Sequence, residues 1–308
     1  MNSWHRGSPF HIHWTSRLMG ISLITAEELK KPRSDRIIVD ARLRKQYDAG
    51  RIPGAIWLRW EEWCERAPDH VSEILKVPGY WGRLADPVQE SFAQRLEQRG
   101  ISSDAEIVVY AAGPRSKGSD GRVAWMLLYF GVKNVRLLDC AWQEWVSDGG
   151  AIETEIKPVA GAKFAVNVQP QRRALLRDCR QRIIDRQVLL IDTRTAREFS
   201  GEIYDYQPRK GSLPGATLIS FSSMYSTGRK FVTGSEYQAM LPADADDKAV
   251  ITYCEVGVRA ATVALLHEIH QQRIVQVYDG SVMEWALDPT LPVCGESTLS
   301  LSKERRII

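Results

Sequence analysis

The residues whose types and spacing could do chemistry lie between positions 250 and 259, which read VITYCEVGVR. The β-branched run before Cys254 is typical of a buried strand, and apolar residues of helical period follow Arg259. Cys254 is therefore expected at the carboxyl end of a strand, where α/β sheets form their sites. A helix N-terminus favours negative charge, Gly257 permits a loop of inward-pointing N–H groups, and Arg259 adds a guanidinium. Such a loop could hold a reactive thiolate and a second, negatively charged sulfur atom.

All residues of this loop are expected to line the substrate site. After the thiol they are Glu255, Val256, Gly257, Val258 and Arg259. The other cysteines lack this context and are expected to be structural or incidental: Cys64, Cys140, Cys179 and Cys294. Because the chain has no C-x-x-C pair, a structural zinc site of the usual spacing is not expected. No other metal and no cofactor are predicted.

The elements that position this loop occur twice in the sequence. Residues 37–58 and 189–219 share a β-branched run, D-x-R, an aromatic residue, glycine and P-G-A in the same order. Further on, the pairs of matching segments are IVVYA at 107–111 with VITYC at 250–254, VRLLD at 135–139 with VQVYD at 275–279, and E-W at 144–145 with 284–285. The second copy carries an insertion between Gly201 and Gly211. Collinear matches of this kind indicate a tandem duplication of one domain.

Short runs rich in valine and isoleucine alternate with segments of helical period. The runs are IIVDA, IVVY, VRLL, LLIDT, VITY and VQVY, and they fit strands buried on both faces of a parallel sheet. Helices are expected at 86–100 and 259–271. The predicted fold is therefore α/β, with two tandem domains that each have a parallel sheet flanked by helices on both faces.

Length and composition agree with two domains. The chain has 308 residues, a net charge of +3 and 44% hydrophobic residues, which are ordinary values for a globular protein. We place one domain at 20–150, a linker at 151–172 and a second domain at 173–296. Residues 1–19 are expected to be a disordered extension, and residues 297–308 a C-terminal tail.

Composition also indicates which partners and which cellular compartment are expected. No apolar run approaches the length of a membrane span, and no block of basic residues stands out. We therefore expect neither membrane insertion nor nucleic-acid binding. Since there is no secretory signal and no disulfide pattern, a cytoplasmic location is the default prediction. The acid-poor N-terminus is a weak argument for targeting to an organelle.

The two copies differ at the position of the thiol. Ala111 stands in the first copy where the second has Cys254. Alanine offers no nucleophile, so the N-terminal domain is expected to be non-catalytic. Its longer loop, 111–121, contains Arg115 and Lys117. These either reach the cleft of the other domain or form a solvated basic loop, and the second interpretation is preferred.

The order of these features resembles that of the tandem-domain rhodanese sulfurtransferases. The resemblance rests on D-x-R, P-G-A, the loop 254–259 and Y-D-G-S at 278–281 with Trp285, and it covers about residues 20–295. It implies that Cys254 takes sulfane sulfur from a small donor, such as thiosulfate or 3-mercaptopyruvate, and forms a persulfide. The sulfur would then pass to cyanide or a thiol, and a thioredoxin-like reductant is a candidate partner. The N-terminal domain would help to shape the cleft.

The D-x-R segment supplies the remaining site candidates. Arg194 and Arg197 are candidate anion binders, and Asp192 is expected to order the loop rather than to act as a base. Family members often carry an arginine just before the aromatic residue of this segment, where this chain has Glu198.

The loop itself also departs from the family pattern. The two positions after the thiol are typically basic in thiosulfate-using enzymes and small in mercaptopyruvate-using ones, but here they are Glu255 and Val256. A carboxylate beside the thiol disfavours a dianionic donor unless it points away.

Two alternatives to sulfur transfer remain at this stage. A phosphatase or arsenate reductase of the same fold would need a loop one residue longer to wrap a tetrahedral oxyanion, whereas only four residues separate Cys254 from Arg259. A non-catalytic rhodanese-like binding module is the other alternative. The retained cysteine, glycine and arginine argue against it, and Glu255 argues for it.

Overall fold

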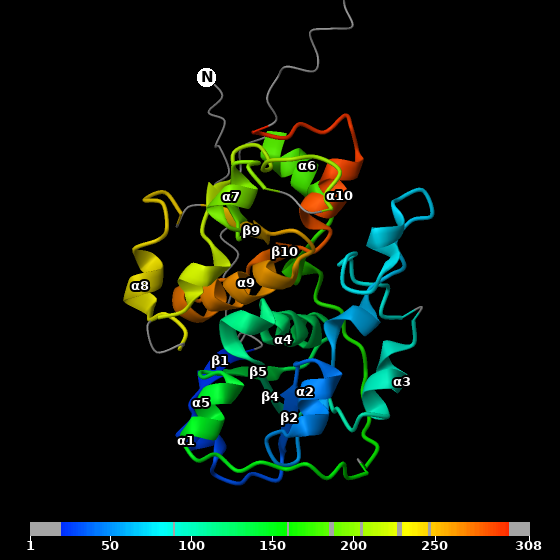
Figure 1. Cartoon of the computed structure of the whole chain (residues 1–308), viewed down its shortest axis with the longest axis vertical. Coiled ribbons are helices and arrows are strands. Elements are labelled where there is room, and N and C mark those ends of the chain that lie inside the picture. Colours follow the sequence, from blue (N-terminus) through cyan, green and yellow to red (C-terminus); the bar gives the residue numbers. More distant parts are fainter. Residues whose placement is uncertain are drawn as a thin grey trace, which may run out of the picture.

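The computed structural model describes residues 20–295 except 89, 159, 185–187, 204–205, 227–229 and 246–247. The expected N-terminal extension and C-terminal tail lie outside the described residues. Two five-stranded parallel sheets with flanking helices make up the structure, one in each half of the chain (Figure 1). The α/β fold predicted from the repeat is thereby confirmed. Both sheets fall within the predicted domain boundaries, which themselves stay a prediction.

The two sheets have the same topology. The N-terminal sheet has the order β1-β5-β4-β2-β3, and the C-terminal sheet has the order β6-β10-β9-β7-β8. The strands of the first sheet are β1 Gly20–Ile24, β2 Arg36–Asp40, β3 Ile56–Trp57, β4 Glu106–Tyr110 and β5 Asn134–Leu138. Those of the second are β6 Arg173–Ala174, β7 Val188–Asp192, β8 Thr217–Leu218, β9 Ala249–Tyr253 and β10 Gln276–Tyr278. Each strand therefore occupies the same place in its sheet as its counterpart in the other copy.

The helices follow the same duplication. In the N-terminal half they are α1 Ala26–Leu29, α2 Arg44–Ala49, α3 Phe92–Glu97, α4 Ser119–Tyr129 and α5 Trp142–Ser147, with the 3-10 helices η1 Trp60–Trp63, η2 Glu73–Lys76 and η3 Gly113–Ser116. In the C-terminal half they are α6 Leu176–Ile184, α7 Ala196–Phe199, α8 Gly234–Gln238, α9 Val258–Gln271 and α10 Ser281–Leu287, with η4 Pro170–Arg172 and η5 Phe221–Met224. Among the residues described, no helix has the length and apolar character needed to cross a membrane.

The six predicted strands agree with the structure, and one predicted helix does not. The helix expected at 86–100 was too long, because only Phe92–Glu97 forms α3. Ser91 adopts a left-handed backbone with φ 51°, which is incompatible with continuing a right-handed helix through it. The helix expected at 259–271 is α9, which begins one residue earlier.

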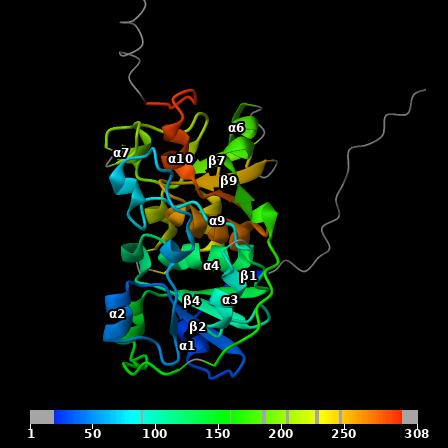
Figure 2. The same cartoon turned by 90° about the vertical axis from the view of Figure 1, so that its right-hand side faces the viewer.

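Helices α4 and α9 pack against each other between the sheets, as both views show (Figures 1 and 2). Every residue of α4 is buried. The helices approach so closely that a Cβ added to Gly121 would lie 2.1 Å from the Thr262 hydroxyl oxygen. The two domains therefore share one continuous core, and the first turns of both helices are held together.

Candidate functional site

In each D-x-R motif the buried arginine binds the aspartate of the motif and the carbonyl of a glycine that precedes the P-G-A turn. We call this set of bonds the latch. In the C-terminal domain Arg194 donates to both carboxylate oxygens of Asp192, and its Nη2 also reaches the Gly211 carbonyl at 2.8 Å. The N-terminal domain repeats these bonds with Arg42, Asp40 and Gly50. Since the domain without a thiol makes the same bonds, we infer that the motif stabilises the fold and does not depend on the presence of the thiol.

This latch changes the assignment of the two candidate anion binders. Arg194 is 2% exposed and is turned to Asp192, and Arg197 is exposed and pairs with Glu202 at 2.8 Å. Neither arginine lines the pocket beside Cys254. Asp192 accepts the backbone N–H of Arg194 at 2.9 Å, so it holds the turn that follows β7. Arg194 and Arg197 therefore lie outside the pocket in which a substrate would meet Cys254.

Cys254 directly follows β9 and is almost fully buried, at 1% exposure. Its Sγ accepts the backbone N–H of Gly257 at 3.2 Å. The curl of the loop requires Gly257 at φ +79°, where an added Cβ would also lie 2.6 Å from the Asp279 Cα. The backbone N–H of Cys254 donates to the Ser281 hydroxyl at 3.1 Å, which fixes the other side of the loop. The sulfur thus lies at the start of α9 and accepts one backbone N–H of its own loop.

Arg259, at the end of the loop, is held by a carboxylate. Its Nη1 and Nη2 donate to the two carboxylate oxygens of Glu198 at 2.9 and 2.7 Å. Burial opposes ionisation of Glu198, but its bonds to Arg259 and to Thr195 outweigh burial and lower its pKa to about 2. The guanidinium therefore enters the site as half of an ion pair, so its attraction for an anionic donor is reduced.

Glu255 points to a segment that the N-terminal domain lacks. The Gln207 side-chain amide, from the insertion between Gly201 and Gly211, donates to Glu255 Oε1. The other carboxylate oxygen lies 3.9 Å from Arg259 Nη2. Burial raises the pKa of Glu255, and the charge of Arg259 acts in the opposite direction.

A pocket of about 340 Å³ opens beside Cys254 and is lined by both domains. The C-terminal domain contributes loop residues and Tyr206 from the insertion. The lining residues of the N-terminal domain are Arg59, Trp60, Gly79, Tyr80, Ser116, Lys117 and Ser119. Tyr80 and Tyr206 meet edge to face, with ring centroids 4.5 Å apart. The N-terminal domain therefore forms part of the pocket wall. Lys117 takes part in it, contrary to the preferred interpretation of a solvated basic loop, whereas Arg115 does not.

Buried polar contacts lock the N-terminal domain against the loop. Arg122 of α4 is fully buried and donates to the carbonyls of Gly82 and Gly257, the latter at 3.5 Å. Its Nη2 lies 3.8 Å from Asp279, which follows β10. A Cβ on Gly82 would lie 1.8 Å from the Val256 carbonyl oxygen. The position of the loop thus depends on residues far away in the sequence.

The equivalent place in the N-terminal domain has no thiol. Ala111 is buried after β4, and its carbonyl accepts the Trp142 backbone N–H at 3.0 Å. The Cys254 carbonyl accepts the Val282 N–H at 3.3 Å in the same way. The backbone framework is therefore duplicated, whereas the thiol is present in one copy.

The other cysteines have different surroundings. Burial raises the pKa of the Cys64 thiol to about 12 and that of Cys140 to about 11, and it also raises the pKa of Cys179. These three thiols stay protonated at neutral pH, so they are poor nucleophiles. Cys294 is exposed, and its backbone pairs with Ser212 beside the P-G-A turn.

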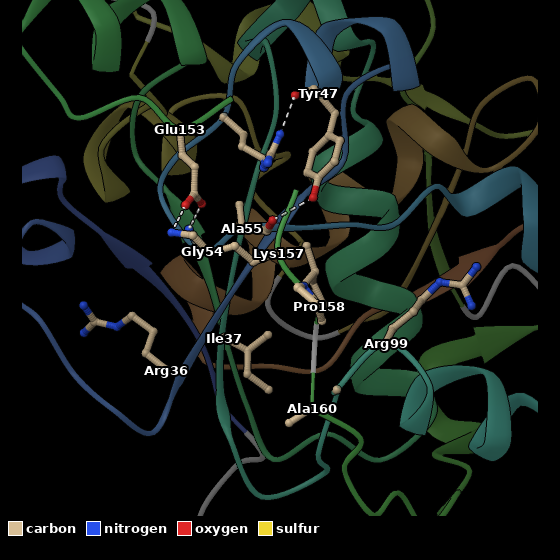
Figure 3. Close-up of a pocket in the computed structure, with 13 residues that line it drawn as sticks. Arg36, Ile37, Tyr47, Gly54, Ala55, Arg99, Glu153, Lys157, Pro158 and Ala160 are labelled. Carbon is tan, nitrogen blue, oxygen red and sulfur yellow. Dashed lines mark hydrogen bonds and ion pairs between the residues drawn. The ribbon is translucent and has the colours of Figure 1, made fainter. Parts of the chain in front are cut away.

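A second pocket, of about 280 Å³, lies in the N-terminal domain away from the thiol (Figure 3). Figure 3 shows Glu153 turned to the Gly54 backbone N–H, which it accepts at 2.8 Å, and the Tyr47 hydroxyl donating to the Ala55 carbonyl. Lys157 pairs with the same glutamate. Glu153 thus joins the predicted linker to the P-G-A turn, and Tyr47 joins α2 to the same turn.

Several residues of the site were missed in the sequence. They are Ser281, Tyr206, Gln207 and the pocket-lining residues of the N-terminal domain other than Lys117. Ser281 belongs to the Y-D-G-S motif and could have been proposed from it. The insertion was visible as a difference between the copies, but its contact with Glu255 arises only from tertiary folding.

The family is shown by comparison with known domains. The model of the rhodanese-like domain matches residues 25–148 and again 175–288. The chain therefore belongs to the rhodanese-like family and contains two copies of the domain, as the repeat predicted.

Curated relatives and a solved structure extend over most of the chain. The 3-mercaptopyruvate sulfurtransferase of Escherichia coli is 28% identical over 82% of this chain and 86% of its own length. The thiosulfate sulfurtransferase of Gallus gallus is 26% identical over 79% and 80%. The crystal structure of SseA from Escherichia coli, described as a 3-mercaptopyruvate sulfotransferase, superposes with a TM-score of 0.70 at 26% identity and covers 84% of this chain and 98% of that one. These relatives support an enzyme of the sulfurtransferase class.

Proposed function

We propose that this chain transfers sulfane sulfur from a small donor, thiosulfate or 3-mercaptopyruvate, to cyanide or a thiol through a persulfide on Cys254. The observation that carries the proposal is the Cys254 sulfur itself, which accepts the Gly257 N–H at 3.2 Å and borders a pocket at the start of α9. Backbone donors and the helix N-terminus stabilise negative charge on an outer sulfur atom.

The reaction has two half-reactions, as in other covalent catalysis by a nucleophile. In the first, the Cys254 thiolate attacks the terminal sulfur of the donor, a sulfur–sulfur bond forms and the bond from that sulfur to the rest of the donor breaks. In the second, cyanide or a thiolate attacks the outer sulfur, and the Cys254 thiolate leaves. A thioredoxin-like reductant is one thiol that could serve as acceptor. Because the cycle requires a free thiol, we propose a reducing compartment such as the cytoplasm.

The loop from Glu255 to Arg259 forms the donor site in this proposal. Lys117 supplies positive charge from the N-terminal domain, and it has no ion-pair partner within the described part of the chain. Arg59 is already bound to Glu61, and Arg259 is bound to Glu198. Because only one of these three cations is without a carboxylate partner among the described residues, the charges around the pocket favour a donor of low negative charge.

Intact mass spectrometry tests the proposal directly. Full-length protein treated with either donor is expected to gain about 32 Da, the mass of one sulfur atom. Cys254→Ala should abolish the gain, while Cys294→Ala, which removes an exposed thiol, should retain it. No gain with either donor, or a gain that persists in Cys254→Ala, would overturn the proposal. Hydrolysis of an aryl phosphate by protein that gains no sulfur would favour the phosphatase alternative.

A further inference from the structure

Glu255 is a carboxyl group beside the candidate nucleophile that the sulfur-transfer scheme above does not use. It follows Cys254 in the chain and lines the same pocket, and its side chain is only 16% exposed. The Gln207 amide donates to it from the insertion in the second repeat. Gln207 is itself buried. An inserted segment that reaches into the site to orient one carboxyl group suggests that the orientation of this group matters.

The charges around Glu255 do not fully neutralise it. Arg259 lies 3.9 Å away but makes its bidentate bond with Glu198. Burial raises the pKa of Glu255, opposed by Arg259, by the Tyr206 hydroxyl and more weakly by Arg194, while the charge of Glu198 raises it further. Glu255 therefore keeps its proton at a higher pH than an ordinary glutamate does, and it can both give and take a proton in the pocket.

The two candidate donors differ in their need for a proton. With thiosulfate, the Cys254 thiolate attacks the outer sulfur, the sulfur–sulfur bond breaks and sulfite leaves with the electron pair. No proton moves in this step. With 3-mercaptopyruvate, the carbon–sulfur bond breaks and its electron pair stays on carbon as the enolate of pyruvate. This enolate must gain a proton, and the thiol of the donor must lose one.

We propose that Glu255, held by Gln207, is the proton-transfer residue of the donor half-reaction and selects a β-mercapto-α-keto acid over a dianionic donor. This inference rests on the persulfide function proposed above. As Cys254 forms its bond to the donor sulfur, the carboxylic acid of Glu255 gives its proton to the enolate. The resulting carboxylate takes the proton from the transferred sulfur, so Glu255 returns to its starting state. Atoms and charge balance without any further reactant.

The same residue acts against thiosulfate. Whenever Glu255 is ionised it repels a dianion, and Glu198 places a second carboxylate beside the same nitrogen of Arg259. A donor with one carboxylate and a neutral thiol meets less repulsion.

The test compares the rates of persulfide formation for both donors in rapid-quench mass spectrometry. Glu255→Gln keeps the shape of the side chain but can neither donate nor accept the proton as an acid does. It should slow loading by 3-mercaptopyruvate by roughly 100-fold, the usual scale of general acid–base catalysis. Loading by thiosulfate should become faster, because a carboxylate that repels a dianion has been removed, and this gain also shows that the loop is intact. Glu255→Asp, which retains the acid, should recover part of the lost rate.

Two controls separate the possible causes. Glu202→Gln makes the same change of charge on the same insertion, at an exposed residue that does not line the pocket, and should leave both rates unchanged. The rate with 3-mercaptopyruvate should fall in deuterated water, whereas the rate with thiosulfate should not. If Glu255→Gln slows both donors equally, or neither, the inference is wrong. If the wild-type protein loads from neither donor, the proposed function itself fails.

Discussion

Gly82 in the N-terminal domain is expected to control the position of the loop that carries Cys254. Its φ is not in the left-handed region, so alanine fits the backbone there and only space opposes it. An added Cβ would lie 1.8 Å from the Val256 carbonyl oxygen and 2.8 Å from the Val256 Cβ. The atoms must separate by about 1.5 Å before the contact becomes ordinary. Gly82 cannot easily retreat, because the buried side chain of Arg122 binds its carbonyl.

Gly82→Ala should therefore displace the loop that carries Cys254 while the protein stays folded. Overpacking of this kind costs about 1–3 kcal/mol of stability. Misplacement of a reacting group by about 1 Å costs roughly 100-fold in rate. We expect persulfide formation on Cys254 to fall by about that factor with either donor, while the thermal unfolding temperature falls by only a few degrees.

The assay is the initial rate of mass gain at Cys254, measured beside the unfolding temperature of the same sample. Gly161→Ala is the matched control, because its Cβ would meet only the Glu97 carbonyl at 3.9 Å. That variant should keep the wild-type rate. If Gly82→Ala also loads at the wild-type rate, contact with the N-terminal domain does not position the loop, and the reasoning is refuted.

Three further predictions concern charge and the latch. Glu198→Gln should free Arg259 and lower the KM for thiosulfate by roughly 3- to 10-fold, as measured in steady-state assays of sulfite release. Burial lowers the pKa of His267 to about 4, so the unfolded chain binds a proton below pH 6.5 that the folded chain excludes. Urea unfolding should therefore show stability falling by up to about 3 kcal/mol between pH 6.5 and pH 4, and less in His267→Gln. Tyr110→Phe removes a hydroxyl that donates to Asp40 at 2.6 Å and should cost about 1–3 kcal/mol in the same assay without changing the loading rate.

The repeated sequence predicted the fold because its signals are local. A β-branched run marks a buried strand wherever it occurs, and two copies in the same order predict the same sheet twice. The helix at 86–100 was too long because the left-handed conformation of Ser91 is a property of the folded chain. Serine is common in helices and loops alike, so its type alone did not reveal the break.

The D-x-R arginine shows the opposite case. A conspicuous cation near a predicted anion site was taken as a binder, but Arg194 folds back onto Asp192 and Gly211. The N-terminal domain lacks the thiol and makes the same bonds, so the structure indicates that this arginine stabilises the fold.

By itself, the sequence determined two α/β domains, a single thiol at the end of a strand, and a short glycine loop before a helix. These features depend on neighbouring residues and on the periodicity of strands and helices. Only the tertiary structure decided which groups surround that thiol. Gln207 reaches Glu255 from an insertion, Glu198 neutralises Arg259, and the N-terminal domain lines the pocket. Such contacts join residues distant in sequence, and packing of the two domains around α4 and α9 brings the N-terminal wall into place.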